Sequence, residues 1–195
     1  MRRYYIQGAI LISILLILMQ IGCSDDIDID STSAIRHTEQ GWISYNSGNF
    51  SQALLNFERA LNSDSEHADA YNGVGWCQLS LSLTLTLALE SFQNAVRYDS
   101  SNADAWIGLA NVLYLRNKDN SDFTSAIRAI DNALAADDAF LYRHDYQSIA
   151  NIYTLKAACF FYLGETEFAK EEFENARQID AENRTVIALQ NLLQE

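Results

Sequence analysis

The side chains that most often carry chemistry are few in this chain and lie far apart. The histidines are His37, His67 and His144, and their separation gives none of the spacings that metal ligands need. The glycines of residues 73–75 fall inside an expected helix, so they do not form a phosphate-binding loop. We therefore predict no metal site and no cofactor.

Cys77 and Cys159 are the candidate nucleophiles, but neither has a predicted histidine partner to activate its thiol. Both fall on first helices of expected helix pairs, where a free cysteine behaves as a small hydrophobic residue. Acidic pairs such as Glu171-Glu172 are common, and on an acidic chain they are typical of solvated helix surfaces. The sequence therefore predicts no catalytic residue and no enzyme.

The segment before Cys23 is typical of a secretory signal. A basic start at residues 1–3 precedes an almost wholly apolar run over residues 6–21, and the small residue Gly22 comes next. The apolar run is short for a stable membrane span, which takes about 20 residues. We predict a signal peptide at residues 1–22, with an uncleaved signal anchor or an ordinary secreted protein as the alternatives.

Residues 20–23, Gln-Ile-Gly-Cys, resemble the lipobox of bacterial lipoproteins, with Gln20 where leucine is usual. The resemblance implies that Cys23 receives diacylglycerol, becomes the new N-terminus and is acylated with a fatty acid such as palmitate. Several acyl chains anchor a protein stably in a membrane. The resemblance also implies a protein of the cell envelope, and Ser24 is similar to the signal for the periplasmic face of the outer membrane. We expect residues 23–33, which are mostly polar and acidic, to be a flexible tether.

The composition of the chain is typical of a helical, acidic protein. It contains no proline and only 8 glycines, which disfavours a β-sandwich built on proline and glycine turns. It carries 26 Asp and Glu against 13 Lys and Arg, for a formal net charge of −13. Nucleic acid needs a basic stripe, and no run of Lys and Arg provides one, so we predict no nucleic-acid partner.

An internal repeat runs through most of the chain. The pair Gly41-Trp42 recurs 34 residues later as Gly75-Trp76. A stripe of two alanines around a large apolar residue, at helical spacing, follows each pair and then returns twice more. The four stripes are Ala53/Phe57/Ala60, Ala88/Phe92/Ala95, Ala126/Ile130/Ala133 and Ala169/Phe173/Ala176. A second helical segment precedes each stripe, so each repeat is predicted to be a pair of packed helices.

These residues resemble the tetratricopeptide repeat, whose W-x2-L and A-x3-F patterns match Trp106-x2-Leu109 and the four stripes. Turn glycines match at Gly48 and Gly164, whereas the proline that usually closes each repeat is absent. The resemblance implies an all-α superhelix of about four helix-turn-helix repeats plus a C-terminal capping helix, in a domain at residues 34–195. The expected repeats cover residues 34–67, 68–102, 103–140 and 150–183, with the capping helix at 184–194.

The stretch 78–90 alternates leucine with serine and threonine, which is typical of a half-buried β-strand. Two observations favour helices instead: the repeat leaves no room for an inserted strand, and leucine is a strong helix former. We predict two helices here, with Thr84 as the N-cap of the second and Leu83 in the place of the turn glycine. Leu81 and Leu87 are the leucines that we expect to be exposed.

In proteins that resemble this chain, the first helix of each repeat lines a concave groove that holds a protein or peptide. The resemblance implies a lipid-anchored scaffold for protein–protein interaction, and similar lipoproteins act in envelope assembly. The predicted groove residues are rich in aromatic and Asn side chains, which anchor interfaces. They are Trp42, Tyr45, Asn72, Trp76, Asn111, Tyr114, Phe161 and Tyr162.

The two groove tryptophans have an alternative role, because Trp42 and Trp76 can also pack between neighbouring helices. Asp69 and Asp104 stand where cations would be needed to bind a C-terminal carboxylate, so we do not expect that mode of binding. An insert at residues 139–149 is interpreted either as a helical extension or as a partner-specific loop. If it closes a pocket, the alternative function is a small-ligand-binding or enzymatic helical-repeat protein. A purely structural spacer is the third hypothesis.

Overall fold

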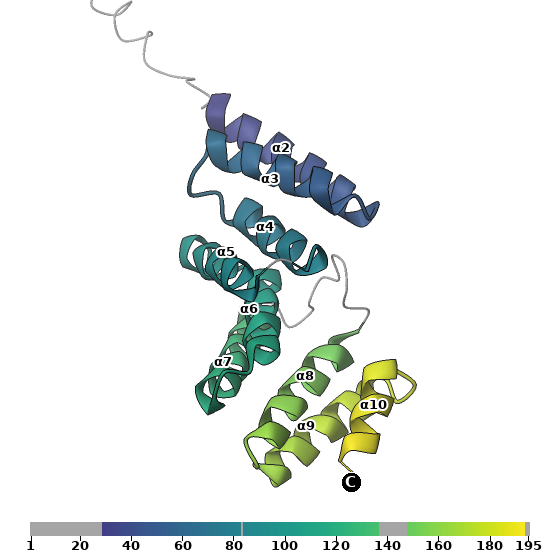
Figure 1. Cartoon of the computed structure of the whole chain (residues 1–195). Coiled ribbons are helices and arrows are strands. Elements are labelled where there is room, and N and C mark those ends of the chain that lie inside the picture. Colours follow the sequence, from purple (N-terminus) through teal and green to yellow (C-terminus); the bar gives the residue numbers. More distant parts are fainter. Residues whose placement is uncertain (1–28, 83, 137–147, 194–195) are drawn as a thin grey trace, which may run out of the picture.

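Helices fill nearly all of the chain that the computed structural model describes, namely residues 29–82, 84–136 and 148–193 (Figure 1). They are α2 (Ile29–Asn46), α3 (Phe50–Ser63), α4 (Ala68–Ser80), α5 (Leu85–Tyr98), α6 (Ala103–Arg116), α7 (Asn120–Ala136), α8 (Ile149–Tyr162), α9 (Thr166–Ile179) and α10 (Arg184–Leu192). No strand occurs among these residues, which confirms the predicted all-α fold. The alternating leucines are helical too, because α4 ends at Ser80 and α5 begins at Leu85.

The helices pair into four consecutive hairpins, and each hairpin packs on the next one (Figure 1). We call α2–α3 unit 1, α4–α5 unit 2, α6–α7 unit 3 and α8–α9 unit 4. The first helix of each later unit contacts both helices of the unit before it, and α10 contacts α8 and α9 in the same way. The result is a one-dimensional stack of four units closed by a capping helix, as predicted.

Phe57 locks the first two units together. Its ring is wholly buried between Gly41 of its own unit and Gly73 of the next. A Cβ atom would lie 2.5 Å from the ring at Gly41 and 2.3 Å from it at Gly73, so neither position has room for a side chain. We call a ring and its two glycines a ring clamp. The second ring clamp joins units 2 and 3 and consists of Phe92, Gly75 and Gly108.

Units 3 and 4 are joined differently. The stripe residue of unit 3 is Ile130, and Ala110 takes the place of the glycine in its own unit. Lys156 of α8 bridges the two units by ion pairs to Asp131 of α7, at 2.8 Å, and Glu172 of α9, at 2.7 Å. Burial alone would lower the pKa of Lys156, but the hydrogen bonds to these two carboxylates outweigh burial and raise it. The lysine is therefore charged, and it replaces an apolar contact with a polar one.

The turns inside units 1, 2 and 4 share one backbone geometry. Gly48 and Gly164 have φ angles of 75° and 79°, in the left-handed region that glycine tolerates best. In unit 2 the left-handed residue is Ser82, with φ at 54°. Leu83, which was predicted for the place of the turn glycine, lies outside the described residues. Thr84 is the N-cap residue of α5, although its side chain makes no capping hydrogen bond.

The turn of unit 3 is held by a buried ion pair. The longer first part of α7 brings Asp122, which is 2 % exposed, against Arg116 at the end of α6. Arg116 Nε donates to Asp122 Oδ2 at 2.9 Å, and the backbone N–H of Lys118 donates to the same oxygen at 2.9 Å. The hydrogen bond from Arg116 is the main cause that lowers the pKa of Asp122, so the carboxylate stays charged inside the turn.

The two ends of the stack differ in character. Helix α2 begins at Ile29, so residues 29–33 are helical and not part of a flexible tether as expected. At the other end, Val186 and Leu189 of α10 are buried against unit 4, as a capping helix requires. Cys23 and most of the insert lie outside the described residues. Within those residues, none of the helices combines the length and apolar character needed to span a bilayer.

Candidate binding groove

The first helices of the units, together with α10, form one continuous face, which we call the groove face. Side-chain hydrogen bonds link successive helices along it. Trp42 Nε1 of α2 donates to Asp69 Oδ2 of α4 at 3.0 Å. Asn72 Nδ2 of α4 donates to Asp104 Oδ2 of α6 at 2.6 Å. The carboxylates at the start of α4 and α6 therefore tie each unit to the one before it.

Over units 1 and 2 the groove face is filled by its own side chains. Trp42 exposes 8 % of its surface, Trp76 3 %, Tyr45 4 % and Asn72 none. The Trp42 ring packs edge-on against the clamp ring of Phe57, with centroids 5.0 Å apart. These four predicted groove residues therefore act in packing, which is the alternative that the sequence left open for the two tryptophans. They leave little surface for a partner in this conformation.

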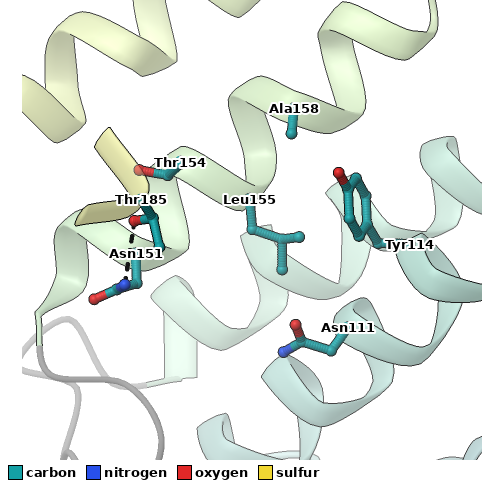
Figure 2. A pocket seen from close by; sticks show the side chains of 7 residues that line it. All are labelled: Asn111, Tyr114, Asn151, Thr154, Leu155, Ala158 and Thr185. Carbon is teal, nitrogen blue, oxygen red and sulfur yellow. Dashed lines mark hydrogen bonds between the residues drawn. The ribbon is translucent and has the colours of Figure 1, made fainter. Parts of the chain in front are cut away.

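Over units 3 and 4 the same face opens into a cavity of about 390 Å³ (Figure 2). The cause is a change at one repeated position, because the place of Trp42 and Trp76 is taken by Asn111 in unit 3 and by Ala158 in unit 4. Helices α6 and α8 also approach each other in fewer places than α4 and α6 do. The cavity is lined by Asn111, Tyr114, Asn151, Thr154, Leu155, Ala158 and Thr185.

The lining combines polar and apolar side chains, and α8 contributes both kinds. Figure 2 shows Leu155 and Ala158 on α8 facing the side of α6 that carries Asn111 and Tyr114. Asn151 lies at the far end of the cavity, where its Nδ2 donates to Thr185 Oγ1 at 3.2 Å. The arrangement offers amide, hydroxyl and aliphatic contacts around one space, which is the usual make-up of a binding pocket.

An aromatic cluster continues beyond Tyr114 towards the turn of unit 4. Tyr162 stacks on Phe123 with centroids 5.3 Å apart, and 48 % of its surface is exposed. The pKa of Tyr114 is raised to about 12. Burial is the main cause, and the neighbouring Tyr162 is the second. Tyr114 is therefore a neutral phenol at any physiological pH. Phe161 is half-buried and packs edge-on against Tyr162 at 5.6 Å.

The structure brings part of the predicted groove set together and adds three residues. Asn111 and Tyr114 both line the cavity, whereas Asn151, Leu155 and Thr185 were not predicted. The sequence held a signal for Asn151, which occupies in α8 the place that Asp104 has in α6. Thr185 belongs to the capping helix, which the sequence suggested only as a solvating end, so its part in the cavity could not be foreseen.

The two thiols do not line this cavity. Cys77 and Cys159 are wholly buried, and burial raises the pKa of both thiols to about 12. Neutral buried thiols are poor nucleophiles, which agrees with their predicted role as small apolar residues. Among the residues that the structure describes, no group of three or more His, Cys, Asp and Glu side chains could hold a metal ion.

Comparison with known proteins gives a consistent family assignment. The family model for the tetratricopeptide repeat matches residues 38–83 and 85–120. No curated protein matches the chain. Among solved structures, Pseudomonas aeruginosa PilF is 20 % identical, with a TM-score of 0.65 over 80 % of this chain and 65 % of that one, so the chain spans about two thirds of its length.

Two further solved structures share the arrangement. YrrB, described as a tetratricopeptide-repeat protein with an unusual peptide-binding site, is 18 % identical, with a TM-score of 0.63 over 85 % of this chain and 78 % of that one. A thermophilic tetratricopeptide-repeat protein of Thermus thermophilus is 19 % identical, with a TM-score of 0.58 over 76 % of this chain and 75 % of that one. At these identities the likeness shows the fold alone.

Proposed function

The chain is a tetratricopeptide-repeat protein, and from this premise we propose that it is a lipid-anchored scaffold of the bacterial envelope that holds a protein or peptide partner in its groove face. The observation that carries the proposal is the cavity over units 3 and 4. Over units 1 and 2 the groove face is closed by tryptophan, whereas a partner finds a concave, partly apolar space where Asn111 and Ala158 replace it. The likeness to YrrB, a protein with a peptide-binding site, supports a peptide as the occupant.

The lipid anchor is proposed from the sequence of the N-terminal segment. The basic start, the apolar run and the lipobox-like Gly22-Cys23 support acylation of Cys23. Residues 24–28 then separate the anchor from α2, and a segment of that length spans at most about 20 Å. Such an anchor would hold the groove close to a membrane surface, and the periplasmic face of the outer membrane is the proposed location.

A capture experiment with matched tryptophan variants tests the scaffold. Ala158→Trp gives unit 4 the residue that units 1 and 2 have at the same position, Trp42 and Trp76. The new side chain fills the cavity, and units 1 and 2 show that the repeat accommodates it. Gln178→Trp on exposed α9 is the control of equal size. The baits are the full chain and its two variants, each with its helical content checked by circular dichroism.

We expect a partner from envelope extract to bind the unaltered chain and Gln178→Trp, and to be lost from Ala158→Trp. A partner held equally by all three proteins would move the binding site away from the cavity. Absence of any partner for the folded chain would contradict the scaffold.

Metabolic labelling tests the anchor separately. A palmitate analogue should be incorporated into the unaltered chain and should not be incorporated into Cys23→Ser. Equal labelling of both proteins, or labelling of neither, would contradict acylation at Cys23.

A further inference from the structure

Two of the three hydroxyl groups that line the cavity, those of Thr154 and Thr185, are directed at protein acceptors. Thr154 Oγ1 donates to the carbonyl oxygen of Ala150 at 2.7 Å. Thr185 Oγ1 donates to Asn183 Oδ1 at 2.8 Å, while it accepts from Asn151 Nδ2. A hydroxyl group has one hydrogen and two lone pairs, so what these two threonines can still offer a ligand is an acceptor. On its α8 and α10 side, the cavity is therefore built to receive hydrogen-bond donors.

The chain around the cavity is acidic overall, although two basic residues, Lys156 and the exposed Arg184, directly adjoin lining residues in the sequence. None of the seven lining residues is charged, and the carboxylates of Asp69 and Asp104 lie in the corresponding first turns of α4 and α6. Lys156 follows the lining residue Leu155, but its ammonium is held by Asp131 and Glu172 of α7 and α9. Net charge of −13 for the whole chain adds a long-range field of the same sign. A cation is favoured at this site and an anion is disfavoured.

We propose that the cavity takes a basic side chain, lysine or arginine, from an extended segment of the partner; this inference rests on the proposed function. An ammonium or guanidinium group has hydrogen-bond donors and no acceptor. It therefore matches the free lone pairs of Thr154 and Thr185 on the α8 and α10 side of the cavity. Its aliphatic stem would pack on Leu155 and Ala158, and the face of the Tyr114 ring can attract the cation. A carboxylate side chain would meet the lone pairs of Thr154 and Thr185, and would find donors only on the asparagine amides and the Tyr114 hydroxyl.

The lining also supplies the reporters for a direct test. Thr154, Leu155, Ala158 and Thr185 carry methyl groups, whose NMR signals report binding inside the cavity. The full chain in detergent micelles is titrated with the amides of Nα-acetyl-arginine, Nα-acetyl-lysine, Nα-acetyl-glutamine and Nα-acetyl-glutamate. The exposed methyl groups of Leu87, in unit 2, serve as the reference for binding elsewhere on the acidic surface.

We expect the arginine and lysine probes to shift the cavity methyl signals and to bind roughly tenfold more tightly than the glutamate probe at low ionic strength, with a smaller ratio at high salt. Ala158→Trp should abolish these shifts, and Gln178→Trp should keep them. Equal binding of the glutamate probe, or shifts that persist in Ala158→Trp, would overturn the inference. If a partner is captured through the cavity but the probes show no preference for charge, the scaffold stands and the basic side chain does not. If the preference holds but no partner is captured, the preference of the cavity for a basic group stands, and both the scaffold and the partner as source of that group are overturned.

Discussion

Gly73 and Gly108 lie inside helices, where glycine costs about 1 kcal/mol relative to alanine. A neighbouring ring explains both residues. A Cβ on Gly108 would lie 2.1 Å from the Phe92 ring, which is wholly buried and cannot turn aside in a close-packed interior. The residue type at these positions is therefore set by an aromatic ring that belongs to the preceding unit.

The second ring clamp can be tested by a double-mutant cycle. Gly108→Ala should lower the free energy of unfolding by about 1–3 kcal/mol, because overpacking against Phe92 outweighs the gain in helix propensity. Phe92→Ile places in unit 2 the residue type that unit 3 carries at Ile130, and the smaller side chain leaves room for a Cβ at position 108. The double variant should therefore lose at least about 1 kcal/mol less than the sum of the two single losses. Urea unfolding followed by circular dichroism measures all four proteins, and additive losses would contradict the ring clamp.

A second residue-scale prediction concerns the left-handed turn residue of unit 2. Ser82→Gly should raise the free energy of unfolding by about 0.5 kcal/mol, because glycine takes a positive φ without the steric cost of a side chain. Gly164→Ser, at the equivalent place in unit 4, should lower it by a similar amount. Thermal unfolding of the two variants measures both effects. A loss of stability in Ser82→Gly would show that its side chain makes a contact that matters more than its φ.

At the scale of the element, the turn of unit 3 combines a left-handed residue, Asn117, with an ion pair. The Asp122 carboxylate accepts both from Arg116 and from the Lys118 N–H of this connection. Because the pKa of Asp122 in the folded chain is lower than in the unfolded chain, the carboxylate adds stability above the unfolded value of about 3.9. That contribution is lost as the pH falls through the lower, folded value.

Asp122→Asn should lower the free energy of unfolding by about 1–2 kcal/mol at pH 7, a range reduced because Arg116 is partly open to solvent. The difference from the unaltered chain should shrink as the pH falls below about 4, because protonation removes the same charge. Glu171→Gln, on the exposed face of α9, is the control and should change little. A difference that stays constant between pH 7 and pH 3 would contradict the buried ion pair as its cause.

At the scale of the whole molecule, the stack is not uniform. Ring clamps join units 1, 2 and 3, whereas units 3 and 4 meet through Ile130 and the ion pairs of Lys156, beside a cavity. In a linear array each unit is stabilised only by its neighbours, so the unit with the weaker junction opens at the lower free energy. Unit 4 should therefore open before unit 2.

The two buried cysteines report this difference. At pH 8, with thiol pKa values of about 12, only roughly one thiol in 10⁴ is ionised in the folded state, so labelling by iodoacetamide requires opening. We expect Cys159 in unit 4 to be labelled several times faster than Cys77 in unit 2 in a Cys23→Ser chain, as measured by peptide mass spectrometry. Equal rates at the two sites would show that the stack opens only as a whole.

The sequence predicted the fold because the alanine stripes record helix packing position by position, and even the alternating leucines follow the helical period once the repeat is seen. It predicted less of the site. A tryptophan at position 42 suits a partner-binding role and a packing role equally well. Only the structure distinguishes these roles, through the hydrogen bond to Asp69 and the burial of the Trp42 side chain. The cavity exists because Asn111 and Ala158 are too small to fill the space that tryptophan fills in units 1 and 2. Thr185, which also lines it, belongs to a helix outside the four repeats.

The ring clamps also bear on how such a chain can grow. Unit 2 carries Gly75 for its own ring and Gly73 for the ring of the unit before it. A tandem copy of residues 68–102 would therefore present Gly73 to Phe92 of the first copy, and Asp69 in the place that Asp104 has now. A copy of unit 3 would instead set Gly108 against the shorter Ile130 and leave a void. Gene duplication could lengthen this protein through unit 2 without any compensating substitution, and that unit is the natural module for building longer arrays from it.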